Sequence, residues 1–180
     1  MYSLVSPRLD LTTAAGAQFD ASGAYRYLLW RTWQPDVPKV AFIMLNPSTA
    51  DASRDDATIR RCRGFAHAWG YGGLVVANLF AYRATRSRDL RAVADPVGAE
   101  ANRYLQLAVL VTAHTFAAWG NGGCWGGRDR AVQPWLKTTP LYCLGQTKLG
   151  CPRHPLYVSK TTIATPFTLG GMSTAGNSPS

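Results

Sequence analysis

VAFIMLNPSTAD, at residues 40–51, begins as a continuous apolar run and breaks abruptly at Asn46 into polar residues. An unbroken run of branched and aromatic side chains indicates a strand that is buried on both faces, as in a parallel sheet. The polar break then lies at the carboxyl end of this strand. Because open α/β folds bind ligands at the carboxyl ends of their strands, we expect a functional site beside Asn46.

Apolar runs and helical patterns alternate along the rest of the chain. Further core strands are expected at residues 74–80, 115–119 and 141–144, and an N-terminal edge strand at residues 25–33. Helices are expected at residues 57–69, 95–108 and 128–136, the first of them capped by Asp55 or Asp56. This alternation predicts an α/β fold with a short, mainly parallel sheet of about four core strands flanked by helices.

Length and composition indicate one globular domain. The chain has 180 residues, of which 47% are hydrophobic, and a chain of this size buries roughly two-thirds of its unfolded surface. We assign residues 1–160 to a single α/β domain. Residues 161–180 are dominated by Thr, Gly, Ser and Ala and are expected to form a flexible C-terminal tail.

The cysteines and glycines argue against bound cofactors. None of the four cysteines shows C-x-x-C spacing, which disfavours a zinc or iron–sulfur site. The glycine-rich residues 120–127 lack the Gly-Lys-Ser/Thr ending of a nucleoside-triphosphate loop. We therefore expect neither a metal nor another cofactor.

The sequence also bears on location and assembly. No apolar run is long enough to span a membrane, and the N-terminus does not read as a signal peptide. We expect a cytoplasmic protein with reduced thiols and no membrane partner. The oligomeric state is left open by the sequence.

The charge of the chain favours a polyanionic partner. Nineteen Lys and Arg residues against ten Asp and Glu residues give a formal net charge of +9, and a domain this basic often binds nucleic acid. The candidate phosphate contacts are Arg60, Arg61 and Arg63 on the first helix, and Arg86 and Arg88 in a loop after the second core strand. A solvated charged face is an equally weighted interpretation of the helical arginines.

Four motifs occur in a characteristic order: LNPSTAD at residues 45–51, DDATIRR at residues 55–61, NLF with a following Tyr-Arg at residues 78–83, and PRHPLY at residues 152–157. Over residues 25–159 the chain resembles the bacterial and phage family called domain of unknown function 1643. The family name implies no activity.

The order of elements is more distantly similar to that of the uracil-DNA glycosylase superfamily, whose fold is a short parallel sheet flanked by helices. Its first motif is Gly-x-Asn-Pro in one branch, and Asn46-Pro47 match it with Met44 at the glycine position. Asn78 and Arg83 match a strand Asn and a following Arg. A final His-Pro-Ser motif is matched by residues 154–156, with leucine in place of serine.

This resemblance implies hydrolysis of an N-glycosidic bond. Such a reaction needs a group that positions water and a donor that stabilises negative charge on the departing base. Asn46 is the candidate for water placement, Asp51 for the base and His154 for the donor. The structural alternative for His154 is a loop histidine that bonds to the backbone, and the imidazole nitrogen that carries the proton cannot be read from the sequence. Asp56 is expected to cap the helix rather than to react.

The candidate substrate-binding residues lie in the same loops. They are Pro47, Ser48, Asn78, Phe80, Tyr82, Arg83 and Arg153. Asn78 suits recognition of a base edge, and the aromatic side chains, with Trp119, suit stacking. The structural alternative for Asn78 is a satisfied amide at a strand end, and the alternative for the aromatic side chains is a place in the core or at its rim.

Three functions therefore remain in competition. The leading hypothesis is a glycosylase-like enzyme that acts on a base or N-glycosidic bond in nucleic acid or a nucleotide. A non-catalytic module that binds a nucleobase or nucleic acid would use the same pocket. The third possibility is a hydrolase of a nucleotide-like metabolite.

Overall fold

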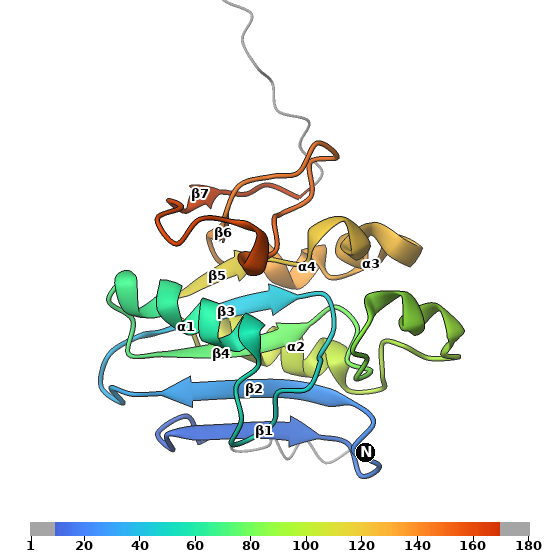
Figure 1. The fold of residues 1–180 in the computed structure, drawn as a ribbon, viewed down its shortest axis with the longest axis horizontal. Coiled ribbons are helices and arrows are strands. Elements are labelled where there is room, and N and C mark those ends of the chain that lie inside the picture. Colours follow the sequence, from blue (N-terminus) through green and yellow to red (C-terminus); the bar gives the residue numbers. More distant parts are fainter. Residues whose placement is uncertain (1–9, 170–180) are drawn as a thin grey trace, which may run out of the picture.

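The computed structural model describes residues 10–169, which form one sheet with helices on both faces (Figure 1). The strands are β1 (Ala15–Phe19), β2 (Arg26–Thr32), β3 (Lys39–Met44), β4 (Gly73–Asn78), β5 (His114–Ala117), β6 (Leu141–Cys143) and β7 (Thr165–Pro166). They are arranged in the order β1-β2-β4-β3-β5-β6-β7. The α/β class expected from the sequence is confirmed.

The described residues form a mixed sheet of seven strands, whereas the sequence predicted a mainly parallel sheet of about four core strands with an N-terminal edge strand. That prediction was wrong in the number and in the direction of the strands. The strands β4, β3, β5 and β6 are parallel to one another. However, β2 runs antiparallel to β1 and to β4, and β7 runs antiparallel to β6. The strand β2 was expected at the edge but lies between two neighbours.

The strand β1 was missed because three of its five residues, at positions 15–17, are Ala or Gly. A side chain at Gly16 would clash, since an added Cβ would lie 2.0 Å from the Trp30 ring on β2. Glycine is therefore required there for the close approach of the two strands. Small residues such as Ala and Gly leave no alternating apolar pattern in the sequence from which a strand could be predicted.

The helix α1 (Ala57–Ala68) follows β3 and begins as predicted. Asp56 caps it, and its Oδ1 accepts a hydrogen bond of 2.9 Å from the Ile59 N–H. The chain turns away just beyond its end at Gly70, whose φ of 78° suits glycine. The first turn of α1 is thus fixed at the sheet edge where β3 ends.

The other helices differ from their predicted bounds. The helix α2 (Ala101–Leu110) begins later than Asp95, because the Asp95 carboxylate accepts bonds from the Val97 and Gly98 amides and closes a turn. Residues 128–136 form two short helices, α3 (Arg128–Ala131) and α4 (Gln133–Leu136). The 3-10 helices are η1 (Ser87–Ala92), η2 (Gly120–Gly127) and η3 (Pro155–Tyr157).

Two hydrophobic cores lie on the two faces of the sheet. In Figure 1, α1 lies in front of the sheet and α2 behind it. Phe42 packs in the α1 core and Ile43 in the α2 core, because successive strand side chains point to opposite faces. This two-sided burial explains the unbroken apolar run of β3.

Part of the segment expected as a tail joins the fold. The strand β7 pairs with β6, and Phe167 contacts the Trp119 ring edge-on, with centroids 6.0 Å apart. Residues 170–180, the rest of that predicted tail, lie outside the described residues. No helix in the described part of the chain is long and apolar enough to cross a membrane.

Candidate ligand-binding site

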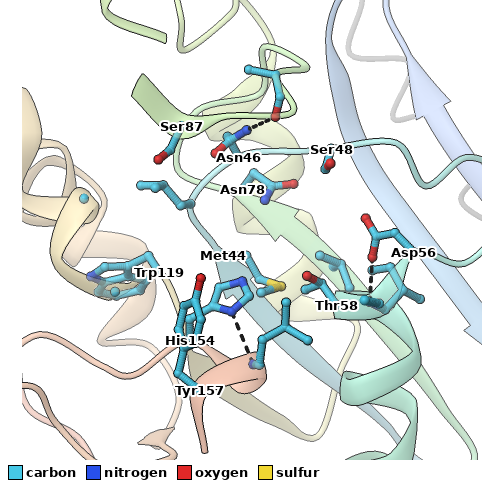
Figure 2. Close-up of a pocket in the computed structure, with 18 of the residues that line it drawn as sticks. Met44, Asn46, Ser48, Asp56, Thr58, Asn78, Ser87, Trp119, His154 and Tyr157 are labelled. Carbon is cyan, nitrogen blue, oxygen red and sulfur yellow. Dashed lines mark hydrogen bonds between the residues drawn. The ribbon is translucent and has the colours of Figure 1, made fainter. Parts of the chain in front are cut away.

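A cavity of about 710 Å³ opens at the carboxyl ends of β3, β4 and β5 (Figure 2). In Figure 1 the arrowheads of these strands point to the same edge of the sheet. The walls come from the loop after β3, the start of α1, the end of β4, the loop containing Ser87, the turn after β5 and the loop that leads into η3. Among the described residues, no group of three or more His, Cys, Asp or Glu side chains could hold a metal ion.

The structure brings together the residues that the strand ends were expected to place together. Asn46, Asn78 and His154 all line the cavity, as do Ser48 and Arg153. Figure 2 shows Asn46 and Asn78 on one side and His154 on the other, with Met44 between them. The geometry agrees with the expected convergence, whereas the chemical roles of these residues stay predictions.

The Asn46 amide is held in one orientation. Its Nδ2 donates hydrogen bonds to the Ala84 and Pro47 carbonyl oxygens at 2.8 and 3.0 Å. Because both acceptors are carbonyls, the nitrogen must face them, and Oδ1 is left without a protein partner among the described residues. The cavity therefore receives a fixed hydrogen-bond acceptor at Asn46.

The Asn78 amide has no hydrogen-bond partner in the described part of the chain. It is the last residue of β4, its exposed fraction is 4%, and its Oδ1 is buried and unsatisfied. An unsatisfied buried polar group costs about 1–3 kcal/mol. A ligand that bonds to this amide would remove that cost.

His154 has a defined tautomer. Its Nδ1 accepts a hydrogen bond of 3.3 Å from the Leu156 N–H. Burial lowers the pKa of His154, and the negative charge of Asp56 raises it by a smaller amount. The ring is therefore neutral at pH 7 and carries its proton on Nε2. This contact with the Leu156 backbone is the structural role considered for His154, and it leaves Nε2–H as the donor that the ring can offer to the cavity.

Several lining residues were missed or given other roles by sequence reasoning. Asp56, expected only as a helix cap, also lines the cavity, as do Thr58 and Tyr157, which the sequence analysis did not single out; Trp119, expected to stack on a base, lines it too. The signal for Asp56 was its position, because a helix that follows a parallel strand begins at the ligand-binding edge. Arg26 lines the cavity too, and its role depends on a strand pairing that the sequence does not reveal.

The proposed base Asp51 lies outside the cavity lining. Its Oδ1 accepts bonds from the Ser53 and Arg54 amides at 2.9 and 2.8 Å, and these bonds lower the pKa of Asp51. Pro47 likewise serves the loop, since its carbonyl accepts from Asn46 and from the Ala84 N–H. Both residues shape the loop after β3.

Three other predicted contacts also do not line the cavity. Phe80 is buried against Trp125, with ring centroids 5.1 Å apart. Tyr82 packs edge-on against Tyr25, and Arg83 donates to the Gly23 carbonyl at 3.1 Å. Phe80 and Tyr82 therefore take the structural alternative given for the aromatic side chains, and Arg83 is bonded within the fold.

The arginines of α1 are engaged within the protein. Arg60 donates to the Asp55 carbonyl at 2.7 Å, and Arg63 forms an ion pair with the Asp55 carboxylate at 2.8 Å. Arg61 donates to the carbonyls of Pro155 and Val158 and so ties the His154 segment to α1. By contrast, Arg86 and Arg88 are exposed on either side of the lining residue Ser87.

The family model described as "Protein of unknown function (DUF1643)" matches residues 26–156. The chain belongs to the DUF1643 family. The matched range of this DUF1643 protein includes the cavity-lining residues from Arg26 to Leu156 and omits Tyr157. No curated protein and no solved structure matches the chain. The likeness to uracil-DNA glycosylases stays a prediction.

Proposed function

We propose that this DUF1643 protein binds a nucleobase in the cavity and acts on its N-glycosidic bond, in nucleic acid or in a nucleotide. The observation that carries the proposal is the buried, unpartnered amide of Asn78. A side-chain amide offers a donor and an acceptor side by side, which matches the edge of a base. A cavity of about 710 Å³ is within the range of small-molecule sites.

The chemistry would use three groups that line the cavity. The Nε2–H of His154 would donate to a base carbonyl and stabilise the negative charge that develops as the bond breaks. Asn46 Oδ1 would hold the attacking water. Asp56 replaces Asp51 as the candidate base, because Asp56 lines the cavity and only its Oδ1 is used by the helix cap. Trp119 and Tyr157 supply aromatic walls.

The test is a search for released base. Oligonucleotides that carry varied modified or damaged bases, together with free nucleotides, are incubated with the protein, and free base and abasic sites are measured by chromatography. His154→Ala is expected to lower turnover roughly 100- to 1,000-fold, like the loss of an oxyanion donor. Gln106→Ala, on the exposed face of α2, is the matched control and keeps full turnover.

Two alternatives are separated when the same oligonucleotides and nucleotides are also titrated for binding. Tight binding without released base identifies a non-catalytic nucleobase-binding module. Turnover of free nucleotides but not of oligonucleotides identifies a hydrolase of nucleotide-like metabolites. Full turnover in folded His154→Ala and Asn46→Ala variants would contradict the roles given to both residues.

A further inference from the structure

Arg26 differs from the other buried arginines in how it is partnered. The Arg31 Nε donates to Asp55 at 2.8 Å, and its other nitrogens donate to carbonyls including those of Asp51 and Trp30. Arg128 donates to the Leu79 carbonyl and to the Asn102 side chain, each at 2.6 Å. Both guanidinium groups are shared among several acceptors, which is how buried charges are usually tolerated.

Among the described residues the Arg26 guanidinium makes a single hydrogen bond, from Nη1 to the Ala50 carbonyl at 2.6 Å. Its exposed fraction is 3%, its Nε is buried without a partner, and Nη2 has none among the described residues. Burial lowers the pKa of this guanidinium to about 10, so it is still charged at neutral pH. Of these three arginines, only Arg26 lines the cavity.

The charge of Arg26 has no close counter-ion. No carboxylate in the described residues lies within the 4.0 Å salt-bridge distance of its nitrogens. Asp56 attracts it from farther away, while Arg83 and Arg31 repel it. A buried cation is costly unless it is paired, so the missing partner is expected to come from the ligand.

We propose that Arg26 binds a phosphate group of the ligand inside the cavity. This inference rests on the proposed function. It specifies that the ligand is a nucleotide unit rather than a free base or a nucleoside. The surroundings suit a phosphate, since the hydroxyl-bearing residues Ser48 and Thr58 line the same cavity. The N-terminus of α1, which begins there, favours anions.

The phosphate has two chemical sources, a free nucleotide or the phosphodiester of a nucleic acid. Asp56 is the one carboxylate among the described lining residues, and Arg153 adds a second positive charge. The positive charge of Arg26 and Arg153 therefore exceeds the negative charge of Asp56 around a bound phosphate. The source is decided by which ligand competes for the site.

Calorimetry with inorganic phosphate, nucleosides, the matching nucleoside monophosphates and a short single-stranded oligonucleotide tests the proposal. The monophosphates are expected to bind roughly 10- to 100-fold more tightly than the nucleosides, as for a hydrogen bond to a charged group. Arg26→Gln is expected to abolish this difference. Arg130→Gln, which removes a positive charge from the exposed surface of α3, is the control and is expected to preserve the difference in affinity between monophosphates and nucleosides.

Each outcome has a distinct meaning. Equal binding of nucleosides and monophosphates overturns the phosphate site and leaves the base site standing. Binding of inorganic phosphate without binding of any nucleoside upholds the phosphate site and overturns the base site. A monophosphate preference that survives in folded Arg26→Gln places the phosphate elsewhere and contradicts the proposal. Oligonucleotides that compete with the monophosphate identify the phosphodiester as a source.

A measurement on the unmodified protein covers the case in which Arg26→Gln does not fold. The Nε–H of Arg26 is buried, so it exchanges slowly with water and gives an arginine side-chain signal in nitrogen–proton correlation spectra. Saturating inorganic phosphate is expected to shift this signal and to leave that of Arg31 in place. Arg26→Lys, which keeps the charge, provides the assignment. An unshifted Arg26 signal under saturating phosphate would overturn the proposal.

Discussion

Single residues at the cavity carry polar groups that lack a protein partner, which lowers the stability of the folded protein. The Asn78 amide is buried without a partner, whereas the Asn46 amide bonds two carbonyls and leaves only its oxygen to the cavity. Polar groups of this kind are retained at functional sites although apolar side chains would be more stable there. The two asparagines should therefore respond oppositely to substitution.

Asn78→Leu is expected to stabilise the protein and to remove ligand binding. The leucine has a similar shape and no unsatisfied amide, so the free energy of unfolding should rise by about 1 kcal/mol. Chemical denaturation measures this change, and calorimetry measures the loss of base binding. Asn46→Asp is the contrasting variant, since a carboxylate cannot donate to the Ala84 and Pro47 carbonyls. A destabilised Asn78→Leu variant would show that the amide has a structural partner.

His154 should make stability depend on pH. Burial lowers the pKa of His154 below its usual value of 6.5, so the unfolded chain binds more protons than the folded protein as the pH falls through that value. The stability contributed by neutral His154 is therefore complete above about pH 6.5 and is lost at lower pH. Denaturation of the wild type and of His154→Gln from about pH 8 to about pH 5 measures this difference. Parallel profiles would contradict the assignment.

At the scale of elements, the five arginines proposed as phosphate contacts divide into two groups. Arg60, Arg61 and Arg63 on α1 are bonded to Asp55 or to the carbonyls around η3 and hold the fold together. Arg86 and Arg88 flank the lining residue Ser87 and are exposed, and Arg88 forms an exposed ion pair with Asp89 at 3.9 Å. Contact with a nucleic-acid backbone is therefore expected at η1 rather than along α1.

Replacing Arg86 and Arg88 with glutamine is expected to reduce the salt dependence of oligonucleotide binding. Each lost phosphate contact lowers the slope of log affinity against log salt concentration by about 0.7 on single strands. Titrations of a labelled oligonucleotide at several salt concentrations give the slope. The paired control, Arg60→Gln with Arg63→Gln, should change it less. Equal changes in both variants would place α1 on the nucleic acid as well.

The sequence predicted the elements better than their pairing. Apolar runs locate where strands end, and parallel strands end at a shared edge, so the meeting of Asn46, Asn78 and His154 could be foreseen. Arg26 could not be foreseen. Arg26 is the first residue of β2. The start of β2 lies beside the end of β4 only because the two strands are antiparallel. Strand direction depends on long-range contacts that local sequence patterns do not encode.

At the scale of the whole molecule, the cavity is built from segments that are far apart in the chain. Arg26, Asn78 and His154 come from β2, from β4 and from the loop before η3. No short fragment of the chain contains all three. Ligand binding is therefore expected only from the assembled sheet, and a bound ligand stabilises that whole assembly.

The central position of β3 has a consequence for hydrogen–deuterium exchange. Its backbone is bonded to β4 on one side and to β5 on the other, and hydrophobic cores cover both faces. Amides in such a strand exchange only when the whole domain opens, whereas those of the edge strands β1 and β7 exchange through local opening. The protection of Phe42 and Ile43 is therefore expected to report the global free energy of unfolding. A ligand that fills the cavity should slow exchange at both amides by the same factor, although neither residue lines it.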